Sequence, residues 1–90
     1  MIYVDQPIYK KSPNGRKSYA HMIADNFEEL HEFAAKIGVK KHFFHSKSLY
    51  KHYDITSDQH AIALENGAIL LTDKATLIEK CRALMAQLKK

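Results

Sequence analysis

The chain has 90 residues, below the usual size of one domain, so we expect no second independently folded unit. With 46% hydrophobic and 27% charged residues it has the composition of a globular domain, and 14 basic against 10 acidic side chains give a net charge of +4 that favours anionic partners. No apolar run reaches the roughly 20 residues that span a bilayer, and the N-terminus lacks the order of a secretory signal. We therefore expect a single domain, residues 1–90, in the cytoplasm, with no membrane partner.

The first part of the chain is predicted to form two paired strands. Residues 2–4 are β-branched and aromatic, and residues 18–23 alternate in the way that gives a strand two different faces. Between them, residues 10–17 contain Pro13, Asn14 and four cations without an acid, which predicts a basic turn. The two strands should pair as a wide hairpin.

Capping residues predict the first helix. Asn26 is a favoured N-cap residue with Glu29 three positions later, and apolar side chains follow at helical spacing. Gly38 is expected to end this helix, with Val39 folding back on it as in a Schellman motif. A short helical turn is expected near residues 40–45.

Two further helices and a strand are predicted in the second half of the chain. Thr56 and Gln59 form a capping box for a helix that Gly67 ends. Residues 69–71 are a short apolar run typical of a strand, and Asp73 is expected to cap the last helix. The apolar face of that helix should consist of Leu77, Ile78, Cys81, Leu84, Met85 and Leu88.

Cys81 is the only cysteine, which excludes an internal disulfide and a cysteine-rich zinc site. Its helical spacing from other apolar residues predicts a small core residue and not a reactive thiol. The predicted order of elements is β-β-α-α-β-α. This order indicates an α+β fold in which a small mixed sheet of about three short strands is covered by three helices.

Two polar blocks stand where strands are predicted to run into helices. His21 and Asp25 form the first block, and His52, Tyr53 and Asp54 form the second. Strand alternation places His52 and Asp54 on one face. Because imidazole and carboxylate are ligands for divalent metals, His21, Asp25, His52 and Asp54 could surround one metal ion and leave a position for water.

The same residues could instead have purely structural roles. Asp25 could share in helix capping, Asp54 could accept hydrogen bonds from turn amides, and His21 could be a half-buried, hydrogen-bonded strand residue. A catalytic site without metal is a third interpretation. In it His52 is a general base oriented by Asp54 or Asp25, and Tyr53 donates a hydrogen bond.

The segment from residue 36 to residue 53 has five lysines, three histidines and no carboxylate, with aromatic residues interleaved. Cations and aromatic faces are what binding of a phosphate-bearing ligand, a nucleotide or nucleic acid, requires. No Walker loop, GxGxxG, GxSxG or HExxH motif accompanies them. The candidate ligand-binding residues are His21, Asp25, Lys40, Lys41, Lys47 and Lys51.

The remaining histidines are predicted to lie on the surface. His42 and His45 belong to the basic segment, and His31 stands beside acids on the first helix. His60 is near the start of the second helix, where a surface role is also expected. These four are not included in the predicted site.

Five sequence blocks resemble a family of bacterial and bacteriophage proteins grouped as domain of unknown function 4031. The blocks are Ile2-Tyr3-Val4-Asp5, His21-Met22-Ile23-Ala24-Asp25, Glu29-Leu30-His31-Glu32-Phe33-Ala34 with Ile37-Gly38, His52-Tyr53-Asp54-Ile55 and Ala63-Leu64-Glu65-Asn66-Gly67-Ala68. The resemblance covers about residues 1–71 and implies that the positions of both polar blocks recur in the family. It leaves the last helix, residues 72–90, outside, and this helix could pack on a second copy to form a homodimer.

The sequence leaves three functions open. The leading hypothesis is a His/Tyr/Asp pocket that binds a phosphate-bearing ligand with the help of nearby lysines. The first alternative is a hydrolase-like enzyme that depends on a divalent metal. The second is a phage interaction protein that acts on a host factor through its surface. The residues do not decide whether the protein is an enzyme.

Overall fold

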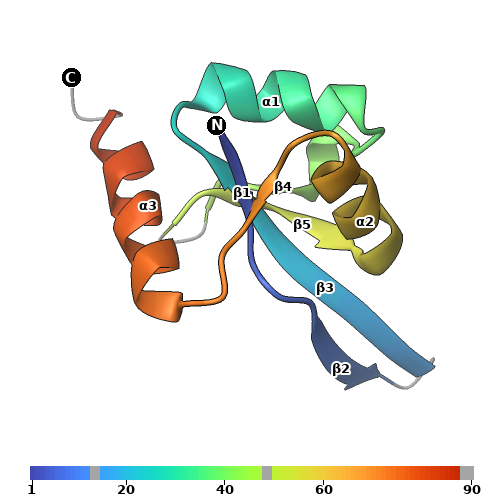
Figure 1. The fold of residues 1–90 in the computed structure, drawn as a ribbon. Coiled ribbons are helices and arrows are strands. Elements are labelled where there is room, and N and C mark those ends of the chain that lie inside the picture. Colours follow the sequence, from blue (N-terminus) through green and yellow to red (C-terminus); the bar gives the residue numbers. More distant parts are fainter. Residues whose placement is uncertain (13–14, 48–49, 88–90) are drawn as a thin grey trace.

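A computed structural model describes residues 1–12, 15–47 and 50–87 of the chain (Figure 1). These residues form an α+β domain, as predicted, in which helices pack on a mixed sheet. Pro13 and Asn14 of the expected turn lie outside the described residues, as does Leu88 at the end of the last predicted helix.

The sheet is built around β3, its longest strand. The strands are β1 (Ile2–Val4), β2 (Ile8–Ser12), β3 (Gly15–Ala24), β4 (Phe44–His45), β5 (His52–Thr56) and β6 (Ile69–Leu70). Their order is β4-β5-β3-β1-β6, and β2 pairs with the first half of β3. Neighbouring strands are antiparallel except β1 and β6, which are parallel. The predicted pairing of the first strand with residues 18–23 is therefore confirmed.

The strand content exceeds the prediction of about three strands. The segment 10–17, predicted as a basic turn, is strand up to Ser12 and again from Gly15. The turn-forming residues at the centre of this segment led to the prediction of a turn throughout, although the residues on either side of them pair as strands β2 and β3. Strand β4, with two residues, is too short to give an alternating pattern.

All three helices begin at the predicted N-cap residues, and the first two end at the predicted glycines. They are α1 (Phe27–Lys36), α2 (Ser57–Glu65) and α3 (Lys74–Ala86), preceded by N-cap residues Asn26, Thr56 and Asp73. A 3-10 turn, η1 (Lys41–Phe43), confirms the short helical turn expected near residues 40–45. Within the described ranges, no helix combines the length and apolar character needed to cross a membrane.

Gly38 ends α1 in the predicted Schellman motif. Its φ of 83° lies in the left-handed region, and the amide of Val39 donates to the carbonyl of Ala34 at 2.8 Å. The amide of Gly38 donates to Ala35 at 3.2 Å. Together these bonds satisfy carbonyl groups that the end of the helix would otherwise leave without partners.

The two faces of the sheet have different environments. Tyr53 and Ile55 of β5 are buried on the face covered by α1 and α2, together with Met22 of β3. His52 and Asp54 alternate with them and lie on the other face. Helix α3 covers part of that second face, where Cys81 is buried as predicted (Figure 1). Both polar residues of β5 therefore lie on the face that α3 covers only in part.

Replacing Gly38 with alanine should destabilise the fold by about 1 kcal/mol, because alanine pays a steric cost at positive φ. An added Cβ would meet no atom within 4 Å, so the effect comes from the backbone alone. Urea unfolding would measure it. Asparagine, which tolerates this conformation better, should lose less than alanine; equal stability of the glycine and alanine proteins would contradict the assignment.

Candidate functional site

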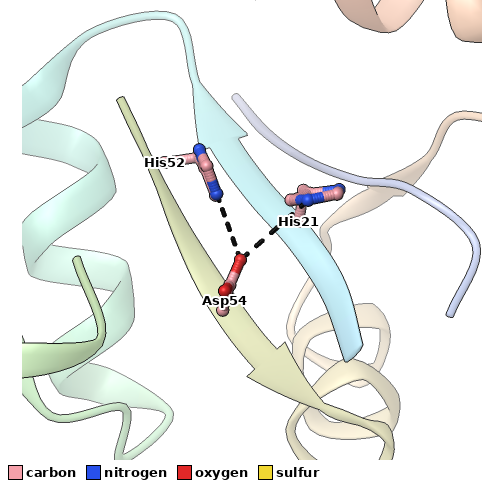
Figure 2. Close-up of side chains that lie close together, drawn as sticks. All are labelled: His21, His52 and Asp54. Atoms are coloured by element: carbon pink, nitrogen blue, oxygen red, sulfur yellow. Dashed lines mark ion pairs between the residues drawn. The ribbon is translucent and has the colours of Figure 1, made fainter. Parts of the chain in front are cut away.

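Three predicted site residues meet on the second face of the sheet (Figure 2). His21 of β3 stands opposite Asp54 of β5 in the antiparallel register, and His52 lies two residues before Asp54 on the same face. Nε2 of His52 is 3.1 Å from Oδ1 of Asp54, and Nε2 of His21 is 4.0 Å from the same oxygen. One potential ligand atom from each of the three residues lies within 4.8 Å of the others.

A carboxylate from outside the predicted site holds His21. Asp5 follows β1, and its Oδ2 lies 2.6 Å from Nδ1 of His21, while its Oδ1 accepts the backbone amide of His21 at 2.6 Å. The Asp5 side chain is largely buried, with 13% exposed. This paired contact fixes both the strand position and the ring orientation of His21. Asp5 was not among the site residues predicted from the sequence, where it appears only in the first of the blocks that resemble the family.

His52 is held in a similar way by a backbone carbonyl. Its Nδ1 lies 2.7 Å from the carbonyl oxygen of Tyr50. Because a carbonyl oxygen only accepts hydrogen bonds, Nδ1 of His52 carries the hydrogen. In neutral His52 the lone pair is then on Nε2, which faces Oδ1 of Asp54. Two electron-rich atoms at this separation repel each other unless a cation, either a second proton on His52 or a metal ion, lies between them.

His45 lies on the surface, as predicted, but it also contacts the site, from which the prediction left it out. Its Nε2 lies 2.8 Å from Oδ2 of Asp54, and its ring stacks on that of His52 at 5.1 Å between centroids and 9° between planes. Strand pairing accounts for this contact, because His45 of β4 stands opposite His52 of β5. Its side chain remains 46% exposed. No local pattern marks the two-residue strand β4, so the pairing was not visible in the sequence.

His60 was also predicted to lie on the surface, and this prediction is wrong. It is 9% exposed, and its Nε2 lies 2.8 Å from the carbonyl oxygen of Asp5. The first turn of α2 packs against the segment that follows β1, which buries the imidazole. His60 therefore positions the backbone of Asp5, whose side chain in turn holds His21.

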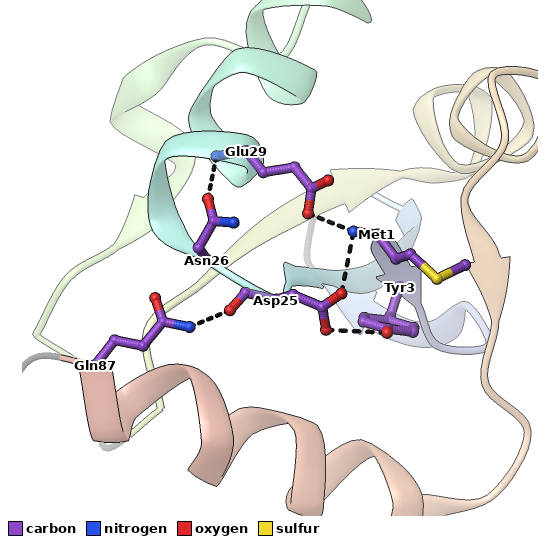
Figure 3. Close-up of polar contacts among 6 residues, drawn as sticks. All are labelled: Met1, Tyr3, Asp25, Asn26, Glu29 and Gln87. Carbon is purple, nitrogen blue, oxygen red and sulfur yellow. Dashed lines mark hydrogen bonds and ion pairs between the residues drawn. The ribbon is translucent and has the colours of Figure 1, made fainter.

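Asp25, predicted as a ligand, lies in a separate cluster at the start of α1 (Figure 3). Its carboxylate accepts hydrogen bonds from the Met1 amine at 3.1 Å and from Oη of Tyr3 at 3.0 Å, and its carbonyl oxygen contacts the Gln87 amide. Burial opposes ionisation, but the hydrogen bonds from Met1 and Tyr3 hold the pKa of Asp25 below its usual value. These contacts are separate from those of His21, His52 and Asp54.

Tyr53 points to the opposite face from its two neighbours. Its side chain is 2% exposed, and Oη lies 2.6 Å from Nδ1 of His31 on α1. The predicted solvated position of His31 is therefore wrong, because its ring is half-buried against Tyr53 and Phe44. Burial raises the pKa of Tyr53; burial, helped by the charge of Lys41, lowers the pKa of His31.

The predicted ligand-binding lysines lie close in sequence to strands β4 and β5, which carry His45, His52 and Asp54 of the site. Lys40 and Lys41 begin the 3-10 turn and Lys47 follows β4, all three exposed. Lys51 is half-buried directly before β5, where its backbone amide contacts Sδ of Met85. These positions place positive charge on the segments that lead into β4 and β5.

Two recesses adjoin the cluster on either side of His21. One, of about 520 Å³, is lined by Tyr19, His21, Phe43, His45, Asp54, Ile55, Thr56 and Gln59. The other, of about 370 Å³, lies against α3 and is lined by His21, Ile23, Tyr50, His52, Lys74, Leu77, Ile78 and Cys81. A small ligand therefore has access to the histidines and to Asp54.

Comparison with known proteins identifies one family. A family model described as protein of unknown function (DUF4031) matches residues 2–84. The match extends past residue 71, where the resemblance seen in the sequence ended, and includes most of α3. No curated protein and no solved structure matches the chain.

His31 should titrate below its ordinary pKa of 6.5 in the metal-free protein, because burial and Lys41 disfavour the imidazolium. Since the unfolded chain binds this proton more readily, the contribution of His31 to stability is present above pH 6.5 and is lost as the pH falls through its folded pKa. Histidine NMR signals, assigned with a His31→Asn protein, would give the midpoint. A midpoint at or above 6.5 would contradict the burial argument.

Proposed function

The chain belongs to the DUF4031 family of proteins of unknown function, and we propose from its geometry that it binds a divalent metal ion and hydrolyses a phosphate-bearing substrate. The metal ligands in this proposal are His21, His52 and Asp54. The proposal combines the metal-dependent alternative with the phosphate-bearing ligand of the leading hypothesis, and it leaves Asp25 and Tyr53 out of the reacting centre.

The observation that carries the proposal is the anchoring of both histidines through Nδ1. His21 is held by the carboxylate of Asp5 and His52 by the carbonyl of Tyr50, at 2.6 and 2.7 Å. Metal-binding histidines almost always have such a partner on the ring nitrogen that does not bind the metal. The Nε2 atoms of both rings approach Oδ1 of Asp54, where a metal ion would relieve the repulsion between electron-rich atoms.

The distances suit a first-row transition metal or zinc. Bonds of about 2.0–2.2 Å place neighbouring ligand atoms about 3–3.5 Å apart. Nε2 of His52 and Oδ1 of Asp54, 3.1 Å apart, are already in this range. Nε2 of His21, at 4.0 Å from Asp54, would have to move closer to the other two ligand atoms. Two imidazoles with one carboxylate favour zinc, manganese, iron or nickel over magnesium, which prefers oxygen ligands.

The surrounding residues support hydrolysis. A metal bound by three protein ligands has room for water and lowers the pKa of that water towards neutrality. His45 holds the second oxygen of Asp54 and so fixes the orientation of the carboxylate. Lys40, Lys41 and Lys47 provide positive charge for a phosphate-bearing substrate.

Zinc or nickel should raise the melting temperature, because an ion that binds only the folded state stabilises it by about 2.7 kcal/mol at a hundredfold excess over Kd. Replacing His52 with alanine should remove this effect, and an Asp5→Asn change should weaken metal binding by about 10- to 100-fold. Thermal unfolding with and without metal, together with calorimetric titration, would measure both results.

The matched control is His42→Ala, which removes an exposed histidine outside the site and should keep the full metal response. A melting temperature that no divalent metal changes would rule out the proposed metal site. An equal response in the His52→Ala and wild-type proteins would place the metal elsewhere.

The zinc- or manganese-loaded protein should release nitrophenolate from bis(4-nitrophenyl) phosphate, and a chelator should stop the reaction. An Asp54→Asn change should abolish turnover because it removes a charged metal ligand, whereas His42→Ala should leave turnover unchanged. Absorbance of the product measures the rate. Metal binding without any product release would contradict the hydrolytic part of the proposal alone.

A further inference from the structure

Two aromatic side chains line the larger recess beside the metal-binding residues. Tyr19 precedes His21 by two residues on the same strand face, and Phe43, on the 3-10 turn, is 40% exposed. Their recess also includes His45 and Asp54. Large exposed aromatic residues next to a polar site provide faces on which a nucleobase can stack.

A basic two-stranded ribbon leads into this recess. Strands β2 and β3 pair from Ile8 opposite Tyr19 outwards, and the ribbon projects from the body of the protein (Figure 1). Lys10 stands opposite Lys17, and Lys11 stands opposite Arg16. The strand positions of the ribbon contain no acid.

Neighbouring pairs of the ribbon belong to alternate faces, so the positions of Lys10 and Lys17 share the face of Tyr19. An anionic partner that follows this face of the ribbon would meet both cationic positions. Because a strand rises about 3.3 Å per residue, the position of Lys17, on the same strand face as Tyr19, lies about 7 Å along β3 from Tyr19. The cationic positions and the aromatic recess therefore lie within the span of a short polyanion.

We propose that the ribbon and the recess bind single-stranded nucleic acid, with a base on Phe43 and Tyr19 and the backbone phosphates along the ribbon. Unstacked bases are available in a single strand, whereas duplex bases are already stacked on one another. This names the substrate class of the site, and cleavage of that substrate rests on the proposed metal-dependent hydrolysis. Binding itself needs no metal.

The test is fluorescence anisotropy of a labelled oligodeoxythymidine of about 12 nucleotides, with chelator present. Wild-type protein should bind it, and Phe43→Leu, which keeps an apolar side chain but removes the aromatic face, should bind about tenfold more weakly. Phe43→Tyr should retain affinity. The pair Lys10→Ala with Lys17→Ala should weaken binding and reduce the slope of log affinity against log salt by about 1.4.

The matched control for charge is Lys36→Ala with Arg82→Ala, which removes two exposed cations from α1 and α3 and should change the salt dependence less than the ribbon pair does. Circular dichroism would verify that each variant is folded. The proposal would be overturned if either the protein with Lys10→Ala and Lys17→Ala or the Phe43→Leu protein bound the oligonucleotide as tightly as wild type. Preference of the wild-type protein for a duplex of the same length would overturn it as well. If the wild-type protein bound the oligonucleotide but no divalent metal, this inference would be supported and the proposed metal-dependent hydrolysis would be contradicted.

Discussion

The register between β3 and β5 is the constraint on which the rest of the candidate site depends. It places His21 opposite Asp54, and through the neighbouring pair of β4 and β5 it brings His45 over His52. A shift of one residue would move His21 to the face covered by α1 and α2, where its imidazole would replace an apolar side chain in the core. Burial of Met22 and Ile55 opposes this shift. The apolar core therefore maintains the polar geometry.

Features encoded by neighbouring residues could be predicted from the sequence. The N-cap at Asn26, the capping box at Thr56 and the left-handed glycine at Gly38 each depend on a few consecutive residues, and the structure confirms all three. The α+β class followed from the same signals. The strand count did not, because a strand of two residues and a ribbon interrupted by turn residues have no clear periodicity.

The membership of the polar cluster depended on pairing between distant strands. His21, His52 and Asp54 were identified as candidates, but Asp5 and His45 reach the cluster only through contacts that link separate segments of the chain. Tyr53 is adjacent to His52 and Asp54 in sequence but does not share their site, because strand alternation places its side chain on the opposite face of the sheet. Asp25 was displaced for a different reason, since the start of α1 lies beyond the end of the pairing between β3 and β5.

Asp5 interacts with two parts of the fold through two different groups. Its carbonyl oxygen contacts His60 on α2, and its carboxylate contacts the ring and the amide of His21 on β3. The ordering of the α2 start and the ordering of the His21 ring therefore share one residue. A ligand that immobilises His21 would also restrict the opening of the first turn of α2. Binding on one face of the sheet would therefore reduce the local unfolding of a helix on the opposite face.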